Sequence, residues 1–398
     1  MSTGEGTPAT AVARGPDVPA ARADEADGPP PTGWRDPRAR RALSGLLSLV
    51  IVGGIFWFVL GQFSDLSSVW RSIRSLSGAE VALIVAVSVF NLATYVPVMV
   101  LATPGLKARQ SFVLTETTTA VSNALPAGGA IGVGLTYTML GSWGFSKSRS
   151  TLSVLVTGIW NNFVKLGTPI VALAILVLQG QPGGGRLVAA LVGLVGLVTA
   201  VVVFALILRS DDFARRAGLT MQGVATRMMA PFHKGPATGW DNAVAKFRSR
   251  VLGLVRHRWL ALTAVTLLSH LALYAVLLTC LRCVGVPDSE VSWAEALVSF
   301  SFARLVTAIP LTPGGVGVVE LALIGSLTGF GGDRPEVVAA VLIFRLFTYV
   351  LPILLGAFTY LFWRQNRSWH DSAPPMPASL APVAIDDAPP ATPAPAAG

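Results

Sequence analysis

Five ionisable side chains lie inside long apolar stretches of this sequence: Lys165, Arg304, Arg345, Glu116 and Glu320. A charged group facing lipid at the centre of a membrane costs roughly 2.5–3.5 kcal/mol on an insertion scale, so these side chains are expected to face inward. There they either pair or hold a ligand. Because the arginine guanidinium matches phosphate in a bidentate geometry, the cations favour recognition of an anionic substrate group.

Amide side chains near the charges complete the set of candidate ligand contacts. Internal ion pairing is the alternative use of the charges, for example Glu320 with Arg304 or with Arg345. The two uses are compatible, because a carboxylate can hold an arginine until a phosphate displaces it. No catalytic residue, metal ligand set or cofactor is expected. The candidate substrate-binding residues are Lys165, Arg304, Arg345, Glu320, Glu116, Asn161, Asn162 and Asn123.

Proline and glycine interrupt two segments that are otherwise long enough to cross a membrane. In a bilayer, a broken helix survives only where protein or a water-filled cavity covers its unpaired backbone groups. The half-helix after each break also begins with free amide groups and a positive dipole end, which suits a phosphate. Glu320 could instead satisfy those amides at the second break, and the glycines could simply allow close helix packing. The residues predicted to break the helices are Pro126, Gly128, Gly129, Pro310, Pro313, Gly314, Gly315 and Gly317.

Composition indicates the elements that must position these residues. Of the 398 residues, 52% are hydrophobic and 13% are charged, and several apolar runs reach the length of about 20 residues needed to cross a bilayer. The fold class is therefore predicted to be all-α, a polytopic integral membrane protein. Crossing segments are expected at about 42–61, 79–102, 151–178, 187–208, 259–281 and 337–363, with interrupted segments at 111–141 and 294–329.

Lysine and arginine counts favour interrupted segments that turn back as re-entrant hairpins. With both segments turning back, twenty basic residues lie inside and five outside, whereas fifteen and ten result if both cross. The first distribution obeys the positive-inside rule better and places both termini in the cytoplasm. It gives six full crossings plus two interrupted or re-entrant helical hairpins. Because each half crosses three times, the two halves are expected to be inverted repeats, as in transporters with a midplane site.

The two ends of the chain and its basic stretch are expected to lie outside the membrane. Residues 1–40 and 368–398 are rich in Pro and Ala and are expected to be disordered cytoplasmic tails around a membrane domain at 41–367. The basic stretch 209–258 is expected to lie against anionic lipid headgroups at the cytoplasmic face, or only to set topology. Nucleic-acid binding is not expected despite the net charge of +9, since no groove-reading motif is present.

The residues around the second break resemble the flippase-like membrane domain of lysylphosphatidylglycerol synthases. The resemblance covers about 42–363, and it implies a stand-alone member of a family that moves lipids between leaflets. Many relatives have an acidic residue shortly after the first break, where this chain has Gly129 to Gly132. The motif consists of Arg304 to Glu320 with Pro310 and Pro313-Gly314-Gly315, then Arg345, Pro352 and Gly356, and in the first half Asn123 to Gly129, Trp143-Gly144-Phe145 and Trp160 to Leu166.

The expected function is that of a lipid translocator in the cell membrane. Its substrate would be an anionic or modified phospholipid, or a polyprenyl-phosphate-linked lipid. The chain ends in a short tail where the bifunctional synthases carry an aminoacyl-transferase domain, so synthesis of lysyl-lipid is not expected. Two alternatives stay open: a membrane glycosyltransferase or other enzyme acting on a lipid-linked sugar, and a non-transporting scaffold that binds partners.

Overall fold

The computed structural model describes residues 66–180, 184–210, 240–307 and 312–370, together with scattered residues between 212 and 226. The predicted crossing at 42–61, the tail at 1–40, nearly all of the tail at 368–398 and the residue Pro310 lie outside the described residues, as does much of the basic loop. The predicted domain boundaries therefore stay predictions.

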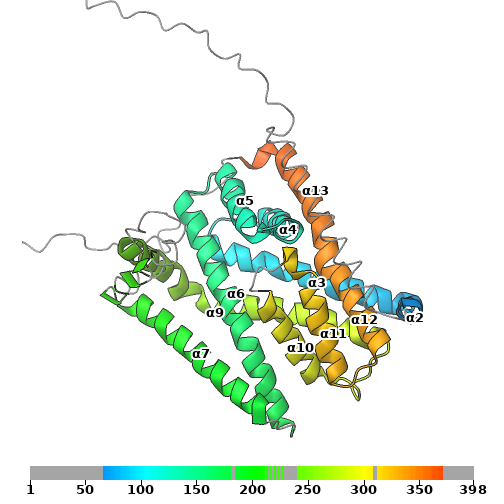
Figure 1. The fold of residues 1–398 in the computed structure, drawn as a ribbon. Coiled ribbons are helices and arrows are strands. Elements are labelled where there is room, and N and C mark those ends of the chain that lie inside the picture. The colour runs from blue at the N-terminus through cyan, green and yellow to red at the C-terminus, as the bar shows by residue number, and fades with distance from the viewer. Residues whose placement is uncertain are drawn as a thin grey trace, which may run out of the picture. The chain divides into compact units, whose positions relative to one another are not determined.

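Every regular element in the described part of the chain is helical, which confirms the all-α prediction (Figure 1). The helices follow the predicted segments closely, because the apolar runs end at the same glycine, proline and polar residues that limit the helices. The elements are α2 (Leu66–Arg74), α3 (Gly78–Ala102), α4 (Ala108–Ala124), α5 (Gly128–Ser142), α6 (Lys147–Leu178), α7 (Gly184–Arg209), α9 (Trp240–Cys283), α10 (Trp293–Val306), η3 (Pro313–Gly315), α11 (Val318–Gly329), α12 (Arg334–Arg345), the π-turn η4 (Leu346–Val350), α13 (Leu351–Gln365) and η5 (Arg367–Trp369).

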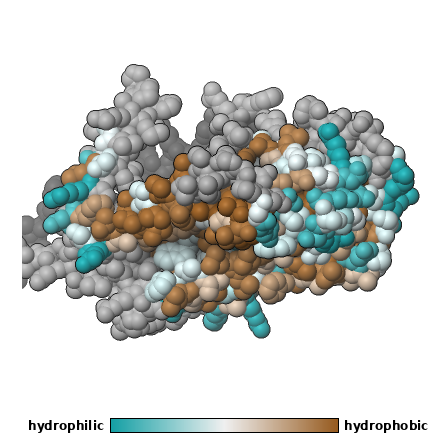
Figure 2. Space-filling view, turned by 90° about the horizontal axis from the view of Figure 1, so that it is seen from below, coloured by the Kyte–Doolittle hydropathy of each residue, from teal (hydrophilic) through white to brown (hydrophobic). Residues whose placement is uncertain are grey.

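Four helical stretches in the described part are long and apolar enough to cross a membrane: Gly78–Ala102, Lys147–Leu178, Arg258–Cys283 and Arg334–Gln365. Each coincides with a predicted crossing. The predicted segment 187–208 forms α7. One face of the molecule carries a broad apolar middle with hydrophilic residues gathered at both ends, the distribution expected of a surface that contacts lipid (Figure 2).

The second interrupted segment folds back on itself. The hydroxyl oxygens of Ser299 on α10 and Ser326 on α11 lie 2.8 Å apart, although 27 residues separate them in the chain. A continuous helix would place them roughly 40 Å apart, at 1.5 Å per residue. Helices α4 and α5 of the first interrupted segment also pack against each other. Both interrupted segments are therefore helical hairpins.

Packing partners correspond between the two halves of the chain. Helix α4, the first arm of one hairpin, packs against α13, while α10, the first arm of the other, packs against α6 (Figure 1). Helix α3 packs against α9, α3 also against α4, and α9 also against α10. Each hairpin thus rests on the long helix that ends the other half, and this exchange brings the two breaks together.

Candidate functional site

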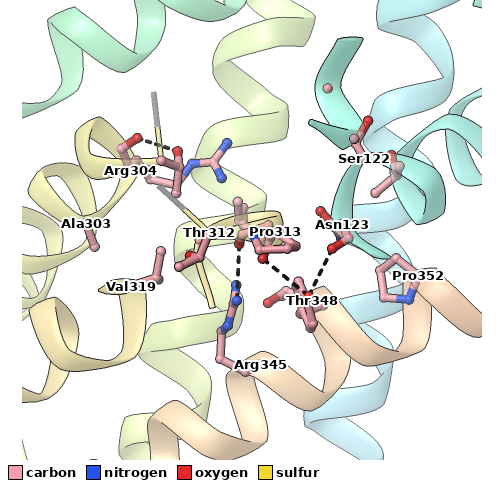
Figure 3. A pocket seen from close by; sticks show the side chains of 18 of the residues that line it. Ser122, Asn123, Ala303, Arg304, Thr312, Pro313, Val319, Arg345, Thr348 and Pro352 are labelled. Atoms are coloured by element: carbon pink, nitrogen blue, oxygen red, sulfur yellow. Dashed lines mark hydrogen bonds between the residues drawn. The ribbon is translucent and has the colours of Figure 1, made fainter. Parts of the chain in front are cut away.

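The two helix breaks border one cavity of about 680 Å³. Residues 125–129 of the first break and 312–315 of the second both line it, with side chains from α3, α4, α6, α10 and the α12–α13 helix. Figure 3 shows Arg304, Arg345 and Asn123 arranged around Thr312 and Pro313 of the second break. Segments far apart in the sequence therefore form a single polar site.

Lys165 and Arg304 line this cavity without a counter-charge. In the described part of the chain, no ion pair joins either of them to a carboxylate. The Nε atom of Arg304 is buried and has no hydrogen-bond partner there. Lys165, Arg304 and Arg345 line the same cavity, so their like charges repel one another there. The cavity therefore holds an excess of positive charge.

Arg345 differs from the other two cations because it is paired. Its Nε donates to Glu320 Oε1 at 2.7 Å, and its Nη2 donates to the carbonyl oxygen of Gly314 at 3.3 Å. Its guanidinium also stacks over the Tyr349 ring, 4.4 Å from the centroid. Arg345 is 7% exposed and Glu320 is 1% exposed. The predicted alternative of internal pairing is therefore realised for Arg345 and Glu320.

Glu320 also satisfies the start of helix α11. Its Oε2 accepts a hydrogen bond from the Gly317 N–H at 2.8 Å, so the Glu320 carboxylate occupies the helix end that could otherwise bind a phosphate. The backbone at this break has positive φ at Gly314, Gly315 and Gly317, which residues with a side chain rarely adopt. The second break is thus held by protein groups, and its helix terminus is already neutralised.

Tyr349 links the two breaks. Its hydroxyl donates to the backbone carbonyl of Asn123 at 3.0 Å, and its ring lies beneath Arg345. It sits in the π-turn η4, just before Pro352, whose missing N–H and bulky ring disfavour a regular turn at this point. Tyr349 is absent from the predicted binding residues. Its position four residues after Arg345 puts it on the same helix face, and this spacing could have identified it as a binding-site residue.

The first break turns at an alanine. Ala127, rather than a glycine, adopts the left-handed conformation with φ of 55°. Gly128 is needed for space, since a Cβ there would lie 2.5 Å from the carbonyl oxygens of Val121 and Ser122. Ala127, the N-cap residue of α5, makes no side-chain capping hydrogen bond. Unlike the second break, the first therefore leaves its helix terminus facing the cavity without a capping carboxylate from the described residues.

The predicted site residues divide into four groups. Asn162 is on the exposed side of α6 and does not reach the cavity, because adjacent helical residues point about 100° apart and Asn161 occupies the inward direction. Glu320, which pairs with Arg345, and Gly317, which donates to Glu320, do not line the cavity. Pro310 is outside the described residues. The remaining predicted residues line the cavity: Lys165, Arg304, Arg345, Glu116, Asn161, Asn123, Pro126, Gly128, Gly129, Pro313, Gly314 and Gly315.

Adjacent glycines at the first break offer a matched test of this geometry. Gly128→Ala should lower the melting temperature in detergent, because its Cβ would meet backbone oxygens that cannot rotate away. Gly129→Ala should melt as the wild type does, because no atom of the described residues lies within 4 Å of its Cβ position. Equal melting temperatures for the two variants would show that the hairpin does not turn as described.

Long apolar helices, two broken hairpins and a buried cationic cavity define a multi-pass helical membrane protein with an internal polar site. The model of the family described as lysylphosphatidylglycerol synthase TM region matches residues 45–356, and the chain belongs to this family. The chain is also similar to a UPF0104 membrane protein of Methanocaldococcus jannaschii, with 42% identity over 64 residues. That match spans 16% of this chain and 27% of the length of the relative.

Proposed function

We propose that this protein moves lipids between membrane leaflets by exposing the cavity at its two breaks alternately to each side. The polar headgroup enters the cavity while the apolar chains stay in the bilayer. The observation that carries the proposal is the cationic excess of Lys165 and Arg304 in a cavity bordered by both breaks. Membership of a family named for a lipid-modifying membrane protein supports a lipid as the substrate.

Inverted repeats form part of the proposal. The correspondence of α4 on α13 with α10 on α6 supports two structurally related halves. Two halves of opposite orientation, each with a broken hairpin, give a site near the midplane that either half can close. The protein would then exchange access by rocking one half against the other. The six crossings, the re-entrant placement of both hairpins and cytoplasmic termini in the cell membrane belong to the same proposal.

The basic residues of the chain predict a lipid partner at the membrane surface. The basic stretch 209–258 would bind anionic headgroups at the cytoplasmic surface. The protein would act as a transporter and not as an enzyme. A detergent assay for sugar release from a polyprenyl-phosphate sugar separates these roles, since a translocator leaves the donor intact while a glycosyltransferase consumes it.

Charge removal in the cavity should slow transport. In vesicles holding the full-length chain, a fluorescent phosphatidylglycerol should cross between leaflets about tenfold more slowly with Lys165→Gln or Arg304→Gln, since hydrogen bonds to charged groups are strong. A membrane-impermeant quencher added outside the vesicles bleaches the fluorescent lipid in the outer leaflet, and the further loss of fluorescence measures the rate of crossing. Both variants should melt at or above the wild-type temperature, because neither charge has a counter-ion among the described residues and its removal relieves repulsion between the cations.

Matched controls carry the same changes outside the cavity. Lys147→Gln alters an exposed lysine on the same helix as Lys165, and Arg364→Gln alters an exposed arginine on α13. Both should transport at the wild-type rate. If the cavity variants match these controls, or if empty vesicles move the lipid as fast as vesicles with protein, the proposed function is wrong.

A further inference from the structure

The charges of the cavity specify the sign of its occupant. Arg345 is neutralised by Glu320, so Lys165 and Arg304 supply the uncompensated charge. Glu116 is the acidic residue of the described lining, and it is 1% exposed with an Oε2 atom that makes no hydrogen bond in the described part. No ion pair joins it to either cation there. Two neighbouring cations without a partner are costly in a low-dielectric interior, and an anion relieves that cost.

Neutral polar groups specify what the anion carries. Asn161 on α6 and Asn123 at the end of α4 both line the cavity and are half-buried. Neither carboxamide side chain makes a hydrogen bond to the described part of the chain. The Asn91 carboxamide, which also lines the cavity, differs because it donates to the Ser269 carbonyl. A carboxamide offers both donors and an acceptor, so it can satisfy a hydroxyl in both of its roles. Two free carboxamides therefore suit a headgroup with hydroxyls.

Volume and net charge agree with this chemistry. The cavity of about 680 Å³ is within the range of pockets that hold drug-sized ligands, and so exceeds the need of a bare phosphate. An ammonium group in the cavity would be attracted by Glu116 but repelled by both Lys165 and Arg304. The cations of the described lining that have no ion pair therefore outnumber the carboxylate that has none. The lining thus disfavours a cationic headgroup.

We infer that the cavity selects a phosphate ester whose headgroup bears neutral hydroxyls, such as phosphoglycerol or a phosphosugar, and rejects aminoacylated and choline headgroups. This inference rests on the proposed transport role of the same cavity. Lys165 and Arg304 hold the phosphate, and Asn161 and Asn123 hold the hydroxyls. The headgroup has two possible sources, a glycerophospholipid and a polyprenyl-phosphate sugar, which share this chemistry.

Binding and transport are measured separately on the full-length chain. Native mass spectrometry in detergent compares retention of phosphatidylglycerol, a polyprenyl-phosphate hexose, phosphatidic acid, phosphatidylcholine and lysylphosphatidylglycerol. The first two should be retained roughly fivefold to tenfold better than phosphatidic acid, which lacks the hydroxyls. The choline and lysyl lipids should bind least. Whichever of phosphatidylglycerol and the polyprenyl-phosphate hexose is retained more strongly identifies the lipid that supplies the headgroup.

Neighbouring asparagines supply the control. Asn161→Leu should abolish the preference for phosphatidylglycerol over phosphatidic acid, while Asn162→Leu, one residue along on the exposed side of α6, should leave it unchanged. Equal retention of all five lipids, preference for the lysyl lipid, or equal effects of the two variants would overturn the inference.

Vesicle transport with the same lipids separates the two proposals. Selective retention without movement between leaflets would uphold the headgroup inference and refute the translocator. Movement of all five lipids at one rate would uphold the translocator and refute the headgroup inference. Selective retention together with selective movement supports both.

Discussion

Arg345→Met should lower the stability of the folded protein by about 3–5 kcal/mol, because it leaves a buried carboxylate without its partner. Glu320 is 1% exposed, and its Oε1 receives the Arg345 Nε at 2.7 Å. The same change removes the contact of Arg345 with the Gly314 carbonyl and with the Tyr349 ring. Thermal melting in detergent, followed by tryptophan fluorescence, measures the loss.

The double variant Arg345→Met/Glu320→Gln is the informative control. Glutamine keeps an oxygen that can accept the Gly317 N–H, now at 2.8 Å from the carboxylate, while removing the uncompensated charge. It should therefore recover most of the lost melting temperature. Additive losses in the double variant would mean that the two residues do not act as a pair, since coupled neighbours depart from additivity.

Gly356→Ala should be the second severe change. A Cβ at this position would lie 2.3 Å from the Glu116 carbonyl oxygen and 2.3 Å from the Ala120 Cβ, so α13 would have to move away from α4. Overpacking of this kind costs about 1–3 kcal/mol and more where backbone must shift. The shift should also break the 2.8 Å hydrogen bond between Thr117 and Thr359 across the same contact. Melting temperature in detergent is the readout.

A graded series strengthens this test. Gly356→Leu should be worse than Gly356→Ala, because more volume enters the same contact. Gly158→Ala on α6 should be close to neutral, since its Cβ position has no neighbour within 4 Å in the part of the chain that the structure describes. If Gly356→Ala and Gly158→Ala have the same melting temperature, then α4 and α13 do not approach as closely as described.

Sequence alone determined the positions of the helices and of the breaks. Apolar runs of membrane-crossing length and the Pro-Gly clusters are local properties, so α3, α6, the apolar part of α9 and the α12–α13 helix were found within a few residues. Charge counts favoured a hairpin at 111–141 strongly and one at 294–329 only weakly, and the Ser299–Ser326 contact shows that the second segment folds back. Local composition suffices here because a bilayer demands internal hydrogen bonding from every segment.

Tertiary structure alone decided how the charges and amides are used. Glu320 could pair with Arg304 or with Arg345, and only the packing of α11 against α12 selects Arg345. Arg304 then has no carboxylate partner among the described residues. Asn161 and Asn162 are equivalent in composition, yet the rotation of α6 turns one inward and the other outward. Sequence spacing fixes angles within a helix, but the orientation of one helix against its neighbours depends on contacts between residues far apart in the chain.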